Sequence, residues 1–105
     1  MRSAYLTAAQ MLKSAREFSL MGKPDEAVRT FYRVVEVLMA LPPERTRDVL
    51  LGHAYLGHYQ TLCVQGEKPD LELLNRGVSY ARTTRDPLVR AIAQECLWAE
   101  GAFQS

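Results

Sequence analysis

The stretch Gly22-Lys23-Pro24-Asp25-Glu26-Ala27 decides the fold of this chain. Its glycine is typical of the end of one helix, and its proline is typical of the first turn of the next, where a missing N–H costs nothing. The two acidic residues complement the positive end of that second helix. A looser copy, Gly66-Glu67-Lys68-Pro69-Asp70, follows with its glycine 44 positions further on, at 66 instead of 22. A turn-and-helix signal that recurs at this spacing indicates a stack of helices.

Five segments of helical period lie between the prolines and glycines. In chain order they cover residues 4–21, Pro24 to Pro42-Pro43, about 44–65, a fourth segment from Pro69-Asp70 and a fifth from Asp86-Pro87. Asp86 and Pro87 are a strong pair for an N-cap and a first helical position. Since no β-alternation competes with this pattern, we predict an all-α fold of about five antiparallel helices joined by short turns.

Apolar residues recur at three- and four-residue steps in these segments, as expected of helices that bury one face. The predicted core stripes of the four outer segments are Ala8, Met11, Ala15 and Phe18; Ala27, Val28, Phe31, Val34, Val35 and Leu38; Leu74, Val78 and Ala81; and Leu88, Val89, Ile92, Cys96, Ala99 and Phe103. The third segment is apolar around most of its circumference, so it must be covered on several sides. We therefore predict that residues 44–65 form the central helix, packed by one pair before it and another after it.

The composition is that of a single folded domain spanning residues 1–105. Hydrophobic residues make up 48% of the chain and charged residues 24%, and no segment is polar enough to predict disorder. The net charge of +1 comes from 13 basic and 12 acidic side chains interspersed along the chain. This distribution argues against nucleic acid or an anionic membrane as a partner.

The charged residues within the apolar runs bear on localisation, and the spacing of the cysteines bears on redox chemistry. The apolar start of the chain is broken by Lys13, Arg16 and Glu17, and no run approaches the roughly 20 residues that span a bilayer. We therefore expect a cytoplasmic protein. Cys63 and Cys96 lie far apart without Cys-x-x-Cys spacing, which predicts buried, reduced thiols.

The stretch from Leu12 to Leu41 resembles a tetratricopeptide repeat. Ala15 and Ala27 stand at the small positions where the two helices of that family's hairpin touch, and Phe18 and Phe31 follow at bulky positions. A small side chain has this role because it lets two helix axes approach closely enough for bulky neighbours to interlock. The next repeat is suggested by a Leu-Gly-x-x-Tyr pattern and by residues of a second helix with its closing proline: Leu51-Gly52-His53-Ala54-Tyr55, then Leu74, Val78, Ala81, Asp86 and Pro87.

The chain also departs from the family pattern. Met11 stands where the family has a tryptophan in its first helix, and the internal period exceeds the standard repeat of roughly 34 residues. Leu51-Gly52 and Gly66 do not share one family register, so the third helix is longer than the family norm. The resemblance implies two tetratricopeptide-like hairpins and a terminal helix in a short α-solenoid, and the alternative is a plain helical bundle.

The resemblance further implies a non-enzymatic interaction module, such as an adaptor, a chaperone or a regulatory subunit, that binds a peptide or protein segment in a concave groove. The first helix of each hairpin would line that groove. Carried over residue by residue, the lining is Ala9, Leu12, Arg16, His53, Leu56, Gln60, Arg90, Ala93 and Leu97. Arg16 and Arg90, one on each side, would hold a carboxylate by bidentate hydrogen bonds, which suggests an acidic or C-terminal segment as the partner.

The last helix offers a rival surface. Trp98 lies about 120° around that helix from the predicted core stripe, beside Ala91 and Ala102. Because an open repeat end without a polar cap needs a cover, the alternative function is a homodimeric structural or regulatory protein that assembles through this edge. In a third arrangement, Trp98 folds back over the preceding helix.

Chemistry of other kinds finds little support in the residue pattern. His53 and His58 are five residues apart, about 140° around a helix, which does not suit zinc, and we expect His58 in the core. Glu44 and Asp48 share a face but are flanked by arginines, which predicts an ion-paired patch. We expect no enzyme activity, no metal and no cofactor. A small-molecule sensor would need convergent polar groups, for which the candidates are Tyr55, His58, Tyr59 and Gln60.

Overall fold

The protein is all-α, as predicted. A computed structural model describes residues 3–104, and of residues 102–104 it describes the backbone alone. Its five helices are α1 (Ser3–Leu20), α2 (Pro24–Met39), α3 (Arg45–Val64), α4 (Leu71–Thr84) and α5 (Pro87–Gln104). Residues 3–104 contain no strand. The predicted segments and the observed helices begin and end within a few residues of each other.

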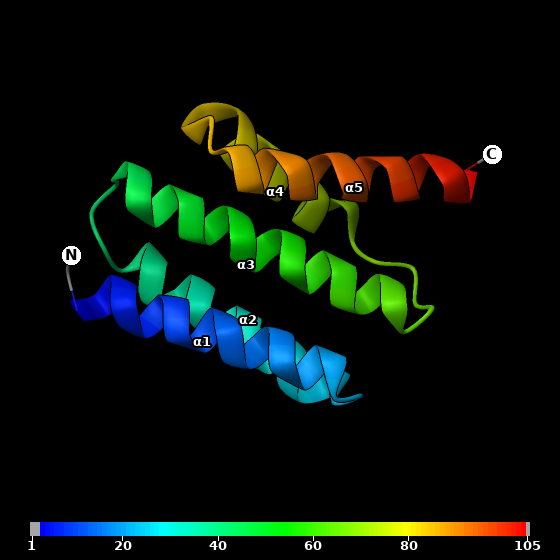
Figure 1. Cartoon of the computed structure of the whole chain (residues 1–105), viewed down its shortest axis with the longest axis horizontal. Coiled ribbons are helices and arrows are strands. Elements are labelled where there is room, and N and C mark those ends of the chain that lie inside the picture. Colours follow the sequence, from blue (N-terminus) through cyan, green and yellow to red (C-terminus); the bar gives the residue numbers. More distant parts are fainter. Residues whose placement is uncertain (1–2, 105) are drawn as a thin grey trace.

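The helices form two layers (Figure 1). In the front layer, α3 lies between α1 and α5 and contacts both; in the rear layer, α2 packs against α1 and α3, and α4 packs against α3 and α5. Within the described residues, α2 and α4 do not pack against each other. Each helix therefore contacts only its neighbours and next neighbours in the chain, and α3 contacts all four others, as expected of the central helix.

Both glycine turns have the backbone that the sequence pattern predicts. Gly22 and Gly66 adopt φ angles of 75° and 76°, in the left-handed region that glycine enters without a steric cost. At the first turn, the N–H of Lys23 donates to the carbonyl of Phe18 at 2.8 Å, and the N–H of Gly22 donates to that of Ser19 at 3.3 Å. This pair of hydrogen bonds is a Schellman motif, so the turn ends α1 and reverses the chain into α2.

Two aspartates cap the later helices. Asp70 accepts a hydrogen bond from the backbone N–H of Glu72 at 3.0 Å, and Asp86 accepts one from the N–H of Val89 at 3.1 Å. Each bond satisfies an N–H that the first helical turn leaves without a partner. The N-cap expected at Asp86 is confirmed, and α4 begins directly after Asp70.

Glycines set the closest approaches of α3 to its neighbours. A Cβ added at Gly57 would lie 2.6 Å from the Phe31 ring of α2, and one added at Gly77 of α4 would lie 2.6 Å from Cγ of Leu56. These distances are far below van der Waals contact, so the bulky partner occupies the space of the missing side chain. Gly57 and Gly77 therefore position α2 and α4 against α3.

The core consists of two clusters that meet along α3. The first joins α1 and α2 to Leu51, Ala54 and Tyr55, and the second joins Leu56 and Tyr59 to α4 and α5. The predicted core residues of α1, α2 and α4 are buried or half-buried. Their counterparts in α5 follow, except that Leu88 is exposed and the side chain of Phe103 lies outside the described residues. The prediction for Leu88 is wrong because it lies a full 100° around the helix from buried Val89.

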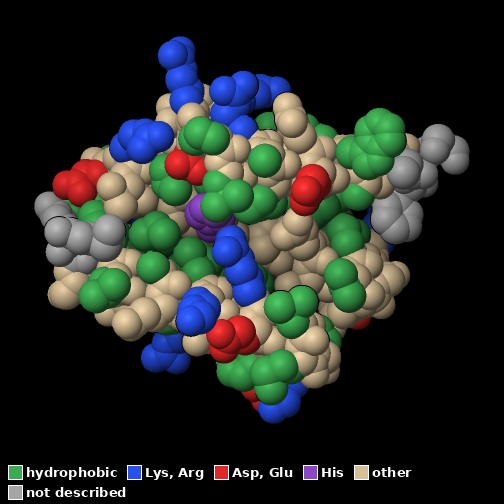
Figure 2. Space-filling model, in the orientation of Figure 1, with side chains coloured by type: hydrophobic (Ala, Val, Ile, Leu, Met, Phe, Trp, Pro, Cys, Tyr) green, Lys and Arg blue, Asp and Glu red, His purple; other side chains and the backbone are tan. Residues whose placement is uncertain are grey.

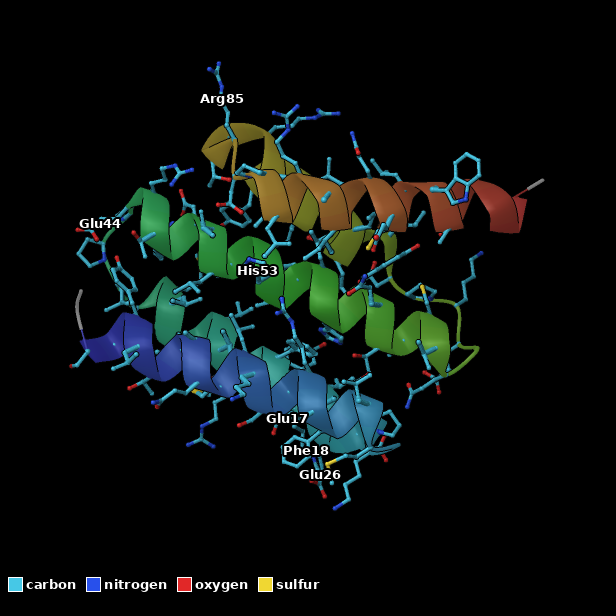
Figure 3. The ribbon with its side chains drawn as sticks, in the orientation of Figure 1. Glu17, Phe18, Glu26, Glu44, His53 and Arg85 are labelled. Carbon is cyan, nitrogen blue, oxygen red and sulfur yellow. The ribbon has the colours of Figure 1, made fainter. Side chains whose placement is uncertain are left out.

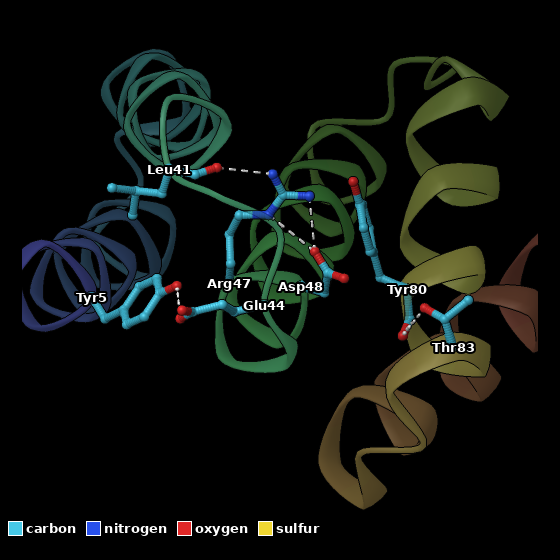
Figure 4. A network of polar contacts seen from close by, with 7 residues as sticks. All are labelled: Tyr5, Leu41, Glu44, Arg47, Asp48, Tyr80 and Thr83. Carbon is cyan, nitrogen blue, oxygen red and sulfur yellow. Dashed lines mark hydrogen bonds and ion pairs between the residues drawn. The ribbon is translucent and has the colours of Figure 1, made fainter. Parts of the chain in front are cut away.

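Polar contacts join the ends of the helices near the α2–α3 connection (Figure 4). Arg47 donates to the Leu41 carbonyl at 3.2 Å and pairs with Asp48 at 3.1 Å. The Tyr5 hydroxyl donates to Glu44 at 2.6 Å, which ties α1 to the start of α3. The ion pair expected around Asp48 is present, whereas Glu44 serves as an acceptor for the neighbouring helix.

Candidate functional site

The front layer presents the face on which the sequence places a groove. At its centre, the Arg16 side chain of α1 reaches His53 of α3, and Nη2 of Arg16 lies 2.8 Å from Nδ1 of His53. Figure 3 labels His53 midway along α3, and Figure 2, in the same orientation, shows a histidine side chain between the front helices with basic side chains beside it. The contact is the polar link between α1 and α3 at this point of the face.

The environment of His53 favours its neutral form. Burial lowers the pKa of His53 most, the adjacent guanidinium of Arg16 lowers it further, and Asp86 raises it in part. Because a guanidinium can only donate, Nδ1 of His53 accepts the hydrogen bond and the ring proton lies on Nε2. Arg16 is thus held by a neutral partner, and within the described residues it forms no ion pair with a carboxylate.

An apolar cleft of 220 Å³ adjoins this pair, between the C-terminal halves of α1 and α3. Its walls include Arg16, Ser19, Leu20, Phe31, Gln60 and Val64. Leu20 and Val64 are 87% and 81% exposed, so their side chains stand at the mouth of the cleft. Phe31 reaches the cleft from the rear layer because Gly57 leaves room for its ring. The face therefore offers apolar surface with one guanidinium at its edge.

Three of the predicted groove residues come together here. Arg16 bonds to His53, and Arg16 and Gln60 line the cleft. The prediction is wrong for two others, which are not on the surface. Leu12 is buried against α2 and α3 in the first cluster, and Leu56 is 0% exposed in the second. Leu56 is directed toward α4, where it fills the space beside Gly77. The resemblance places Leu56 in the groove lining, but the close approach of α4 covers it.

The predicted contribution of α5 to the groove is also corrected. Arg90, Ala93 and Leu97 border a shallow hollow that they share with Val78 and Arg82 of α4. They therefore face the rear layer, because the rotation of α5 turns Val89 and Cys96 toward α3 instead. Arg90 does not lie opposite Arg16 across the α1–α3 cleft, so the two arginines do not form the expected carboxylate clamp.

The rival surface on α5 is exposed. Trp98 is 82% exposed and does not fold back over α4, and Ala91 is exposed on the same side of the helix. Ala102, the third residue predicted for this edge, has a side chain outside the described residues. The outer surface of α5 thus keeps a large aromatic ring in contact with solvent.

The polar side chains expected to form a sensor pocket point in different directions. Tyr59 donates to Glu100 of α5 at 2.7 Å, and Gln60 lines the front cleft. Tyr55 and His58 line a separate pocket between α2, α3 and α4. His58 is buried, as predicted.

Residues that sequence reasoning missed are Leu20, Phe31 and Val64, the apolar walls of the cleft. The sequence analysis assigns Phe31 to a core stripe and gives Leu20 and Val64 no role at a site. The signal for their role was Gly57, a small residue one helical turn from His53, which exposes the edge of an aromatic ring from the layer behind.

The described part of the chain holds no cluster of three or more histidine, cysteine, aspartate or glutamate side chains arranged to bind a metal ion. In the same residues, every helix is too short or too polar to cross a bilayer.

Comparison of the chain with models of protein families, with curated protein sequences and with solved structures finds no match.

Proposed function

We propose that this chain is a non-enzymatic interaction module that binds a peptide or protein segment across the front face of α1 and α3. The observation that carries the proposal is the apolar cleft of 220 Å³ with Arg16 at its edge, a cation whose described partner is a neutral histidine. The partner that fits has an apolar side chain for the cleft and a carboxylate, from an acidic residue or a chain terminus, for the guanidinium.

The packing order supports a tetratricopeptide-like stack as the scaffold for this face. In such a stack, each hairpin packs on the next, so contacts join helices that are close in the chain. The contacts of α1, α3 and α5 in one layer, with α2 and α4 behind, follow this order. The alternative scaffold is a plain helical bundle, which is also all-α. We place this adaptor-like module in the cytoplasm.

The test is a peptide selection followed by calorimetry with the best binder. Arg16→Ala removes the guanidinium and Val64→Asp puts a charge at the mouth of the apolar cleft, so each is expected to weaken binding at least about tenfold, or 1.4 kcal/mol. Arg33→Ala and Met39→Asp are matched controls, because both residues are exposed on α2 away from the cleft. Equal affinity in all four variants would exclude the front cleft as the binding surface.

A second candidate function is homodimerisation through α5. The specific observation is the 82% exposure of Trp98, a residue type that is enriched at the buried centre of interfaces. Sedimentation equilibrium is expected to show a dimer for the natural chain and a monomer for Trp98→Glu. A monomer at every concentration of the natural chain would contradict this function and leave the front cleft unaffected.

A further inference from the structure

The rear of the molecule has a pocket of its own, on the side opposite the face shown in Figure 2. It has a volume of 230 Å³ and lies where α2 and α4 approach α3 without touching each other. Tyr32 comes from α2, Tyr55 and His58 come from α3, and Asp70 and Glu72 come from the start of α4. Ligand pockets for drug-sized molecules are usually larger, about 300–1,000 Å³, so this one has room for a single side chain.

His58 is a buried polar side chain with unused hydrogen-bonding capacity. Its side chain is 5% exposed, and its contacts are the rings of Phe31, stacked at 6.4 Å, and of Tyr32, edge-on at 4.8 Å. Among the described residues, none forms a hydrogen bond to its imidazole. No fully shielded side-chain nitrogen or oxygen in this part of the chain is left without a partner, so the ring nitrogens of His58 keep some accessible surface, and His58 lines the pocket.

The charge of the pocket selects a cation. Burial lowers the pKa of His58, so the ring is neutral and offers one lone pair to a donor. The guanidinium of Arg76 is paired with Glu72 at 2.7 Å, whereas the carboxylate of Asp70 accepts, among the described residues, only the backbone N–H of Glu72. With two carboxylates and one guanidinium, the lining carries a single net negative charge.

The pocket wall already holds a cation in this way. The guanidinium carbon of Arg76 lies 5.8 Å from the centroid of the Tyr55 ring, within the range of a cation–π contact, while the same group pairs with Glu72. Tyr32, exposed on the opposite wall, presents a second aromatic ring next to His58. Val35 and Leu73 add apolar surface of the kind that covers the methylene stem of a long cationic side chain.

We propose that this rear pocket takes the ammonium or guanidinium of a lysine or arginine side chain from a partner protein. The head group donates a hydrogen bond to His58, pairs with Asp70 and lies against the exposed ring of Tyr32. The methylene stem lies against Val35 and Leu73. This site is independent of the front cleft, and the proposal does not rest on the function assigned to that face.

The test is a titration followed by the ring signals of the two histidines in NMR spectra. The probes are the peptides acetyl-Gly-Gly-Lys-Gly-Gly-amide and acetyl-Gly-Gly-Arg-Gly-Gly-amide, whose blocked ends carry no charge, with the corresponding norleucine peptide as the neutral control. We expect saturable shifts of the His58 signals with the two cationic peptides and no saturable shift with norleucine. His53, on the opposite face, serves as the internal reference. No saturable shift, or an equal response to norleucine, would overturn the proposal.

Two variants test the residues without threatening the fold. Asp70→Asn keeps the helix cap of α4, since asparagine caps as well as aspartate, but removes the charge. Tyr32→Leu removes an exposed ring. Each substitution is expected to weaken the binding of the cationic peptides about threefold or more. Asp25→Asn, the same charge change outside the pocket, is expected to leave affinity unchanged.

Unchanged affinity in Asp70→Asn and Tyr32→Leu would overturn the assignment to this pocket. A further arm uses n-butylammonium, a free amine with the same head group. Binding no tighter than that of the lysine peptide supports docking of a side chain. If the free amine bound tenfold more tightly, the pocket would belong to a small-molecule amine and the docking proposal would be wrong.

Discussion

Gly77 carries a packing role that depends on the absence of a single carbon. In the interior of a helix, glycine is about 1 kcal/mol less favourable than alanine, so a glycine there needs a structural reason. Gly77 is buried in α4, and the side chain of Leu56 occupies the space where its Cβ would lie. Gly101, in α5, has nothing within 4 Å of the corresponding position. The two residues therefore respond to the same substitution in opposite ways.

We expect Gly77→Ala to destabilise the protein by about 1–3 kcal/mol, because Leu56 must leave its rotamer or α4 must move away from α3. Gly101→Ala, the matched control, is expected to stabilise α5 by up to about 1 kcal/mol through helix propensity alone. Urea unfolding followed by circular dichroism at 222 nm measures both. A Gly77→Ala protein as stable as Gly101→Ala would show that α3 and α4 do not depend on this close approach.

At the scale of the helices, the two histidines of α3 face opposite layers and are both kept neutral by burial. The pKa of His53 is lowered from 6.5 by burial and by Arg16, and that of His58 is lowered by burial. As the pH falls, each imidazole takes up a proton near pH 6.5 in the unfolded chain and only at a lower pH in the folded protein. Protonation therefore favours the unfolded state, and the contribution of these residues to stability is complete above that pH and declines below it.

We expect the free energy of unfolding to fall as the pH is lowered from about 7.5 to about 5.5, by less than about 1.4 kcal/mol per pH unit for each histidine. His53→Gln removes one of the two titrations and is expected to give a shallower slope. Arg16→Ala is expected to raise the pKa of His53, measured from its ring signals by NMR, and to leave that of His58 unchanged. A steeper slope in His53→Gln would contradict the sign of the effect.

At the scale of the whole molecule, α3 joins the two core clusters because it contributes residues to both. Its neighbouring residues Tyr55 and Leu56 belong to different clusters, so the loss of one cluster exposes a helix that the other requires. The contacts join each helix only to its close neighbours in the chain, which in longer repeat proteins allows parts to unfold separately. In this chain of 105 residues, both clusters share α3, so we expect the two clusters to unfold together and not separately.

Val34→Ala truncates a fully buried side chain in the first cluster, and we expect it to lower the free energy of unfolding by about 1–3 kcal/mol. We expect the protection of slow-exchanging amides to fall by the same amount in α4 as in α2. Native-state hydrogen exchange measures both helices in one experiment. The matched control is Val37→Ala, a half-buried position on the same helix, with a smaller and equally shared effect. Protection of α4 that survived Val34→Ala would show that the two clusters unfold separately.

Prediction from the sequence succeeded where the cause is local. Gly22, Gly66, Asp86 and Pro87 mark helix ends through backbone preferences that need no tertiary contact, and the helices begin and end next to them. The apolar circumference of residues 44–65 predicted the central position of α3, because a helix of that kind must be covered on several sides. At the site, the resemblance to a tetratricopeptide repeat placed Arg16, His53 and Gln60 in the groove lining, and the structure brings these three together on the front face of α1 and α3.

The failures lie where one helix covers another. Leu56 and Leu12 have the spacing of surface residues on the front face, but the approach of α4 and α2 buries them. The resemblance placed Arg90 and Leu97 in the groove, and this failed because the rotation of α5 about its axis cannot be obtained from its own residues. That rotation depends on how Val89 and Cys96 fit against α3.

By itself, the sequence determined five helices, their turns and the central place of α3, because turn chemistry and apolar periodicity act over a few residues. Tertiary structure alone decided which side chains remain accessible: the cleft beside Arg16, the rear pocket beside His58 and the bare ring of Trp98. Accessibility is a property of pairs of helices, set by how closely glycines such as Gly57 and Gly77 let them approach, and residues distant in the chain determine it jointly.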